Sequence, residues 1–240
     1  MFGAIISTLG SIGSVISSNI GSIGSALSSF ATSVAPVLGN IINTIKPVAE
    51  AIGHFANVFL QALGILKPDE KIENIGERAL QAAEKGITTD KFDNFESYMT
   101  ALREFDLDPD IAAKRNPTEK LVAGLGVGIF GVEDKFHAER GSLDGLWLLP
   151  MTNPAYFTAD RMQSLLASGR LAGDIFGYLE KHLSGGEARN IEKNLEVGAD
   201  GKALSETEKG ELYGALDAAQ DKWADLAKQV EAKHRPLHSD

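Results

Sequence analysis

Six residues in the middle of the chain match a cofactor-binding pattern. Gly126 to Gly131 reads GVGIFG and fits the GxGxxG spacing of dinucleotide-binding loops. Such a loop lies between a strand and a helix of a β-α-β unit, so that the glycines let a pyrophosphate approach the backbone. Here a helix start at Asn116 and Pro117 precedes the glycines, and no strand pattern flanks them. We therefore expect a tightly packed helix or a small apolar hairpin, with contact to a membrane as a further possibility, and no cofactor.

Glu139 and Asp144 are a second candidate pair, because they lie near Trp147 in a turn-rich segment. Two carboxyl groups on opposite sides of a glycosidic bond are the machinery of most glycosidases. Acidic residues are also common at helix ends, and their separation in sequence does not give their distance in space. The protein is expected not to be an enzyme, with a peptidoglycan hydrolase built on these two residues as the alternative.

Metal-ligand spacing is absent from the sequence. The five histidines, His54, His137, His182, His234 and His238, do not form a zinc-binding motif. The segment around Asp200 and Gly201 resembles the centre of a calcium loop but lacks the carboxylates required at its first, third and twelfth positions. It is expected to be a turn before a capped helix. His54, whose charge could change near neutral pH, is the histidine best placed for pH-dependent insertion.

The composition narrows the classes of function. The chain has 240 residues, a net charge of −10 and no cysteine. Nucleic-acid affinity depends on Lys and Arg that displace counterions, so direct DNA binding is not expected. The absence of cysteine excludes disulfides and thiolate metal sites.

The stretch from Met1 to Ile45 contains no Asp, Glu, Lys, Arg or His, although Ser, Thr, Asn and Gly occur throughout it. GSIGSVISS from Gly10 recurs as GSIGSALSS from Gly21, an offset of eleven residues that is close to three helical turns. Apolar residues recur at steps of three and four as far as Leu66, which predicts a long amphipathic helix or helices. Its apolar face includes Ile12, Ile16, Ile20, Ile23 and Leu27.

The other face of this predicted helix carries small residues. Gly10 with Ser14, and Gly21 with Ser25, lie four residues apart and would let two helix backbones approach closely. Pro36 and Pro47 predict kinks or breaks, because proline removes a backbone hydrogen bond. Polar residues interrupt every window of about twenty residues, so a clean transmembrane span is not expected.

Beyond Leu66 the sequence is acidic and predicts further helices. Starts are expected at Pro68, Asp90, Asn116, Thr158, Arg170, Ser184 and Ser205, and an ordered loop is expected from Gly141 to Pro154. No convincing strand is predicted, so the fold class is all-α. The predicted organisation is an uncharged Gly/Ser-rich helical region over residues 1–66, a soluble acidic helical domain over residues 67–232 and a frayed tail over residues 233–240.

The layout of residues 1–66, an apolar Gly-, Ser- and Ala-rich N-terminus joined to a helical domain, resembles the small DNA-ejection proteins of tailed phages and segments of tape-measure proteins. The resemblance implies a non-enzymatic, oligomeric virion protein that passes into the host envelope. Its partners would be other copies of itself, other virion proteins and the host membrane, with genome DNA contacted at most indirectly. Its N-terminal helices would form or line a channel for genome delivery. The alternatives are a structural plug or assembly factor of a phage tail or secretion machine, and a pore-forming toxin.

Overall fold

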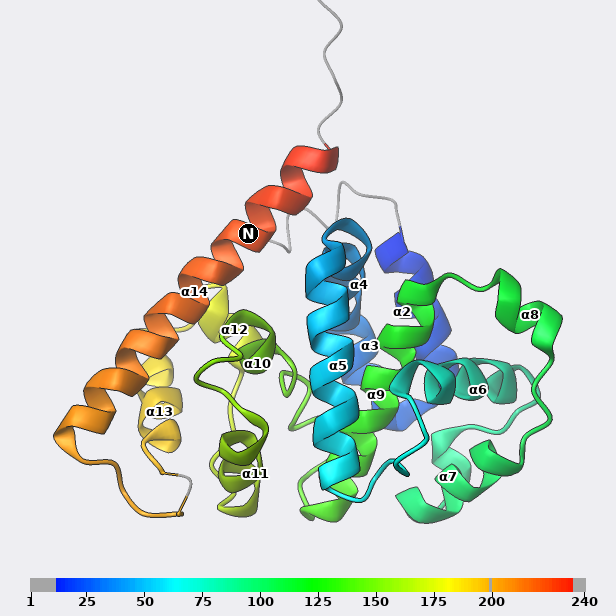
Figure 1. Ribbon diagram of the computed structural model, residues 1–240, viewed down its shortest axis with the longest axis horizontal. Helices are drawn as coiled ribbons and strands as arrows, with labels where there is room; N and C mark the ends of the chain where they lie inside the picture. The colour runs from blue at the N-terminus through cyan, green and yellow to red at the C-terminus, as the bar shows by residue number, and fades with distance from the viewer. Residues whose placement is uncertain (1–11, 199, 235–240) are drawn as a thin grey trace, which may run out of the picture.

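The computed structural model describes residues 12–198 and 200–234, and the all-α prediction is confirmed (Figure 1). The helices are α2 (Ile12–Ile23), α3 (Ser28–Ser33), α4 (Ala35–Thr44), α5 (Lys46–Ala62), α6 (Ile72–Glu84), α7 (Phe95–Glu104), α8 (Pro109–Lys114), α9 (Pro117–Lys135), α10 (Leu148–Thr152), α11 (Ala159–Ala167), α12 (Ile175–Leu179), α13 (Gly185–Leu195) and α14 (Glu206–His234), with 3-10 turns η1 (Ser25–Leu27) and η2 (Thr89–Lys91). Within this described part, extended pairing is limited to one isolated bridge between Val197 and Ala203.

The N-terminal amphipathic stretch is divided into several helices. Gly24, with φ of 145°, separates α2 from η1. Pro36 and Pro47 each lie in the first turn of a new helix, α4 and α5 respectively. The backbone N–H groups of the first turn have no hydrogen-bond partner within a helix. A proline there, which lacks the N–H, therefore costs no helical hydrogen bond.

Helix α9 runs through the centre of the molecule, and every residue from Leu121 to Glu133 is buried. Asn116 begins it by accepting a hydrogen bond from the Thr118 amide at 2.8 Å. Helices α2, α4, α5, α6 and α7 all pack against it. Such a helix is apolar on every side because it has almost no solvent face.

The long helix α14 covers one side of the molecule, where it packs on α4, α10 and α12 (Figure 1). The buried Trp223 indole donates to Glu180 Oε1 at 2.7 Å, and Lys233 Nζ donates to the Thr44 carbonyl oxygen at 2.5 Å. The predicted boundary after Leu66 lies in the loop between α5 and α6. Residues on both sides of it belong to one hydrophobic cluster.

Several local predictions differ from the structure. The helices expected from Pro68 and Asp90 begin at Ile72 and Phe95, and Asn94 caps the second of them by accepting from the Ser97 amide. Gly141–Pro154 was expected to be a loop throughout, but it contains the buried helix α10, whose side chains the tertiary core stabilises. The helix expected from Arg170 is reduced to α12. Gly173 has φ of 101°, and Asp174 caps the helix by accepting from the Gly177 amide, so the chain begins its helix only at Ile175.

Candidate functional site: the N-terminal surface and the pocket beside it

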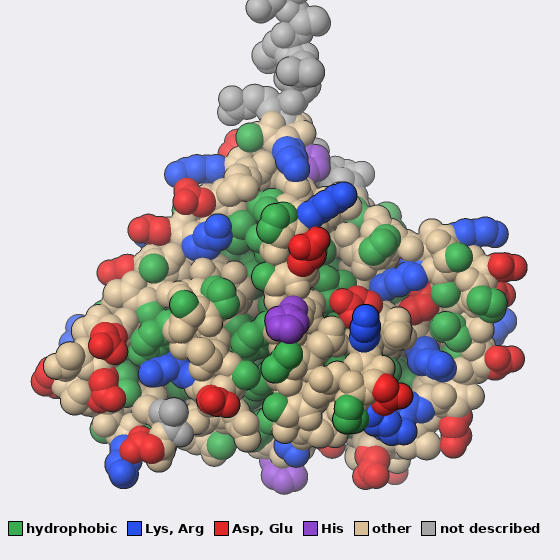
Figure 2. Space-filling view, in the orientation of Figure 1, with side chains coloured by type: hydrophobic (Ala, Val, Ile, Leu, Met, Phe, Trp, Pro, Cys, Tyr) green, Lys and Arg blue, Asp and Glu red, His purple; other side chains and the backbone are tan. Residues whose placement is uncertain are grey.

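The outer face of the N-terminal helices is a surface without charge, which we call the uncharged surface. Its exposed residues are Ser14, Val15, Ser18, Gly21, Ser22, Ser25, Ser28, Ser29 and Thr32. Elsewhere charge is abundant: acidic and basic side chains are interspersed over α14 and over α6 to α8 on the face in Figure 2. The uncharged surface therefore contrasts with the mixed-charge surface around it.

The structure places three of the four predicted packing residues on the uncharged surface. Ser14 and Gly21 are exposed on α2, and Ser25 is exposed at the start of η1, whereas Gly10 lies outside the described residues. A Cβ atom built on Gly21 would meet no atom within 4 Å. Another helix backbone could therefore approach closely at Gly21.

The predicted apolar face points the other way, into the core. Ile16, Ile20, Ile23 and Leu27 are each at most 1% exposed, and Ile12 is half-buried. The Ile16 side chain lies on Gly39 of α4 and fills the space where a Cβ would stand. In this conformation the apolar face of α2 packs against other helices of the same molecule.

The described helices contain no single segment long and apolar enough to cross a membrane. One pair meets the length and composition requirements together, Ser25–Ser33 with Ala35–Thr44, and it is bent by 55° at the break. Most of this pair is buried in the core. Core helices of globular proteins can have the same length and apolar composition. If the chain inserted into a membrane, this pair is the segment that would have to leave the core.

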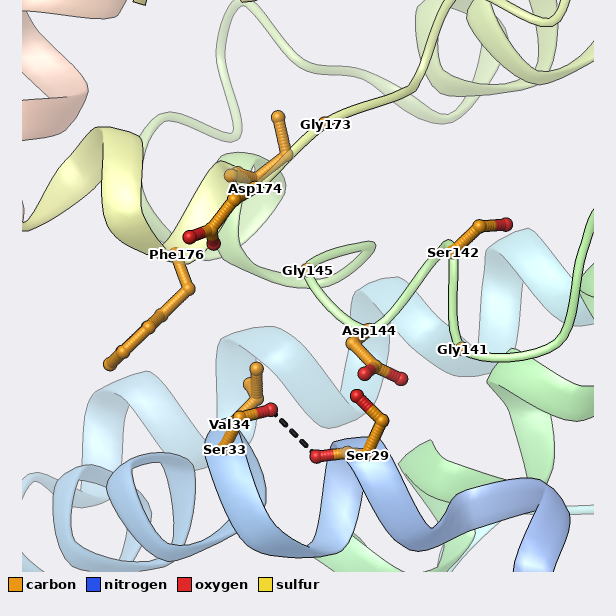
Figure 3. Close-up of a pocket in the computed structure, with 11 residues that line it drawn as sticks. Ser29, Ser33, Val34, Gly141, Ser142, Asp144, Gly145, Gly173, Asp174 and Phe176 are labelled. Carbon is orange, nitrogen blue, oxygen red and sulfur yellow. Dashed lines mark hydrogen bonds between the residues drawn. The ribbon is translucent and has the colours of Figure 1, made fainter. Parts of the chain in front are cut away.

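A pocket of about 440 Å³ lies where α3 faces the loop after α9 and the start of α12 (Figure 3). It is lined by Ser29, Ser33, Val34, Gly141, Ser142, Asp144, Gly145, Gly173, Asp174, Ile175 and Phe176. Asp144 and Ser29 point toward one another from opposite walls. Burial raises the pKa of the Asp144 carboxyl, and a hydrogen bond from Ser29 partly offsets the rise.

A second carboxyl, that of Glu133, is buried in the last turn of α9. It is fully inaccessible to solvent, and its Oε1 accepts from the amides of Gly141 and Leu143 at 2.9 and 3.1 Å. Burial raises the pKa of Glu133 to about 7; the two amide hydrogen bonds act against this, as does Arg140, while Asp144 reinforces it. Glu133 was not identified from the sequence, in which it and Asp134 together follow the apolar run GLGVGIFGV.

The structure places one of the two carboxyl groups of the predicted hydrolase pair at the pocket. Glu139 is exposed and does not line the pocket, whereas Asp144 does. Glu133 has a pKa suited to a general acid but is closed off from any substrate.

The GxGxxG residues are part of helix packing. Gly126 lies against Phe30, Gly128 against Leu60 and Trp147, and Gly131 against Phe95. These side chains fill the space that a pyrophosphate would need. In the described ranges there is also no group of three or more His, Asp or Glu side chains arranged to hold a metal ion.

No protein-family model matches the chain, and no curated protein or solved structure is significantly similar to it.

Proposed function

We propose that this protein is a non-enzymatic virion protein of a tailed phage, whose N-terminal helices associate with other copies and form or line a channel for genome delivery across the host envelope. The folded molecule is the form in which those helices are stored. Its proposed location is the virion, followed by transfer to the envelope. The phage assignment rests on the resemblance in layout, and the association rests on the uncharged surface.

The single observation that carries the proposal is the absence of charge from that surface. Lys46 and Glu50 cancel within residues 1–66, so the net charge of −10 belongs to the chain from Lys67 onward. Copies of an acidic protein repel one another except where their surfaces are neutral. Hydroxyl and glycine positions such as Ser18 and Gly21 also permit close helix contacts in a bundle or a water-lined pore.

Membrane insertion would require a second step, release of the N-terminal helices from the core. Burial of one Ile or Leu side chain contributes about 1.5–3 kcal/mol, so exposing Ile16, Ile20 and Ile23 to water is unfavourable. A lipid surface or a bundle of copies would replace the lost contacts. The N-terminal helices are therefore expected to stay in the core until a lipid surface or other copies of the protein can replace its contacts.

The first experiment introduces a charge into the uncharged surface. Ser18→Lys and Gly21→Lys change exposed positions of α2, and Ser97→Lys is a matched control at an exposed position of α7. Oligomer mass in detergent and dye release from liposomes are measured for each. We expect oligomers and dye release from the unmodified protein, a severalfold loss of both in the two α2 variants and no change in the control.

The alternatives give different results in the same experiment. Oligomers without dye release favour a structural plug or assembly factor. Dye release from a protein that needs no other virion component, and that acts on intact cells, favours a pore-forming toxin. A chain that stays monomeric and releases no dye under all conditions overturns the channel proposal.

A further inference from the structure

One carboxyl oxygen of α9 accepts two backbone hydrogen bonds from the loop that follows the helix. Glu133 Oε1 accepts both the Gly141 and the Leu143 amide, at 2.9 and 3.1 Å. The other oxygen, Oε2, is buried and has no hydrogen-bond partner among the described residues. An unpartnered oxygen is tolerable on a neutral carboxyl and costly on a carboxylate, because the negative charge is shared by both oxygens.

The same loop holds the N-terminal helices. The Ser29 side chain of α3 and Asp144 point toward one another across the pocket (Figure 3), and Ser29 lowers the pKa of the Asp144 carboxyl. Gly141 lies beside the same serine, since a Cβ built on it would stand 3.5 Å from Ser29 Cβ. A change in the conformation of residues 141–144 would therefore weaken the contacts that hold α3.

The charges around Glu133 favour its neutral form on balance. Asp144 repels a charge on Glu133, and the partial negative charge at the C-terminal end of α9 does the same. Arg140 attracts it but is engaged elsewhere: it pairs with Asp134 at 3.2 Å and lies 3.8 Å from the centre of the Phe130 ring.

Among the described residues, Arg140 is the cation that lowers the pKa of Glu133. Asp90 of η2 and Asp93, which follows η2, line the pocket that Arg140 also lines, and Ser29 and Ser33 of α3 line the pocket beside Asp144. Lys91 of η2 donates to the Gly86 carbonyl oxygen at 2.6 Å. The charges that act on the pKa of Glu133 are therefore those of Asp144, which raises it, and Arg140, which lowers it.

The direction of the pH effect follows from linkage. The pKa of Glu133 is about 7 in the folded protein, against 4.5 for an exposed glutamate. The closed loop thus binds the proton more tightly than an opened loop, and its stability falls as pH rises from about 4.5 to about 7. Above that range both states are ionised and the effect levels off.

We propose that Glu133 and Asp144 form a proton-dependent latch, closed while Glu133 is protonated, that holds α3 on the body of the protein and weakens when both carboxyls are ionised. The latch is a property of the fold, and its use as a trigger for releasing the N-terminal helices rests on the proposed function. The released segment would begin with the bent apolar pair Ser25–Ser33 and Ala35–Thr44.

Hydrogen exchange without lipid tests the latch directly. Exchange of the α3 and α4 amides is followed from pH 5 to pH 8 and expressed as protection factors, which remove the pH dependence of the intrinsic rate. We expect protection in α3 and α4 to fall by roughly tenfold between pH 6 and pH 8, the size that a pKa shift from 4.5 to about 7 produces by linkage. Protection in α13, far along the chain, should not follow this curve.

Three variants complete the design. Glu133→Gln, neutral at every pH, should abolish the fall. Asp144→Asn should move its midpoint to lower pH, because the charge of Asp144 raises the pKa of Glu133. Glu139→Gln on the same loop should leave the fall unchanged. Protection independent of pH in the unmodified protein, a fall that persists in Glu133→Gln, or an unchanged midpoint in Asp144→Asn overturns the latch. Asp144→Asn keeps the test decisive if Glu133→Gln does not fold.

Dye release from liposomes separates the latch from the proposed function. Release that increases between pH 6 and pH 8, and loses this dependence in Glu133→Gln, supports both. Absence of release at every pH, with the pH-dependent protection intact, overturns the channel and supports the latch alone.

Discussion

Gly76 of α6 and Gly124 of α9 meet where the two helices cross, and backbone atoms of the opposite helix occupy the space of each missing Cβ. A Cβ on Gly76 would overlap the Lys120 carbonyl oxygen, and one on Gly124 would overlap the Ile72 carbonyl oxygen. Backbone cannot move aside as a flexible side chain can. This crossing positions α9, and hence Glu133 at its end, relative to the rest of the core.

Substitution at the crossing should therefore be severely destabilising. Gly76→Ala or Gly124→Ala is expected to lower the free energy of unfolding by at least about 2 kcal/mol, because overpacking against backbone forces the helices apart. The free energy of unfolding is measured by urea denaturation, monitored by circular dichroism. Gly214→Ala is the matched control: its Cβ would meet nothing within 4 Å, so removal of a mid-helix glycine should stabilise α14 by about 0.5–1 kcal/mol. A loss at Gly214 as large as that at Gly76 would contradict this account.

The pH dependence of global stability should change in Glu133→Gln. Because the folded pKa of Glu133 is raised to about 7, this residue lowers stability progressively as pH rises from about 4.5 to 7, by up to about 3 kcal/mol. Glutamine keeps an oxygen for the Gly141 and Leu143 amides and does not ionise. The difference in unfolding free energy between variant and unmodified protein should grow in the variant's favour from pH 5 to pH 8. A difference that is constant over this range would show that Glu133 titrates normally.

The buried carboxylate of Glu77 depends on Arg115. Arg115 Nε lies 3.1 Å from Glu77 Oε1, and Lys120 Nζ lies 3.6 Å from the other oxygen. Arg115→Met should cost about 2–3 kcal/mol, because Lys120 is then the remaining cation beside the buried carboxylate, which also accepts from Gln81 Nε2 at 2.8 Å. The double variant with Glu77→Gln should recover part of the loss in urea unfolding. Lys228→Met, which breaks an exposed pair with Asp225, should change stability by less than about 0.5 kcal/mol.

Gly21 allows stability and association to be separated. Gly21→Ala should raise the melting temperature of the monomer, because Gly21 is an exposed mid-helix glycine with open space around it. If Gly21 is a close-packing position in the assembly, the added methyl group should weaken oligomers in detergent severalfold. Analytical ultracentrifugation and thermal unfolding measure the two effects. Stronger association would show that the helices do not meet at Gly21.

Local signals in the sequence identified most of the longer helices and the starts at Asn116, Thr158, Ser184 and Ser205, whereas the helices expected from Pro68, Asp90 and Arg170 begin later, at Ile72, Phe95 and Ile175. Ser184 with Glu187, and Ser205 with Glu208, form the predicted reciprocal caps. These motifs act over four residues, so neighbouring side chains alone specify them. The short helices α8 and α10 were missed because neither has enough turns for a periodic pattern, and α10 depends on burial.

The sequence by itself determined that the chain is helical and that residues 1–45 avoid charge, because periodicity and composition are local properties. Only the tertiary structure decided what the apolar stripe covers. Ile16 and Ile20 lie in the same core as α9 and α14, while Gly21 faces outward, since contacts between distant segments select which face is buried. The same is true of Glu133: its sequence neighbours are ordinary, and its raised pKa comes from the helices and the loop that close around it.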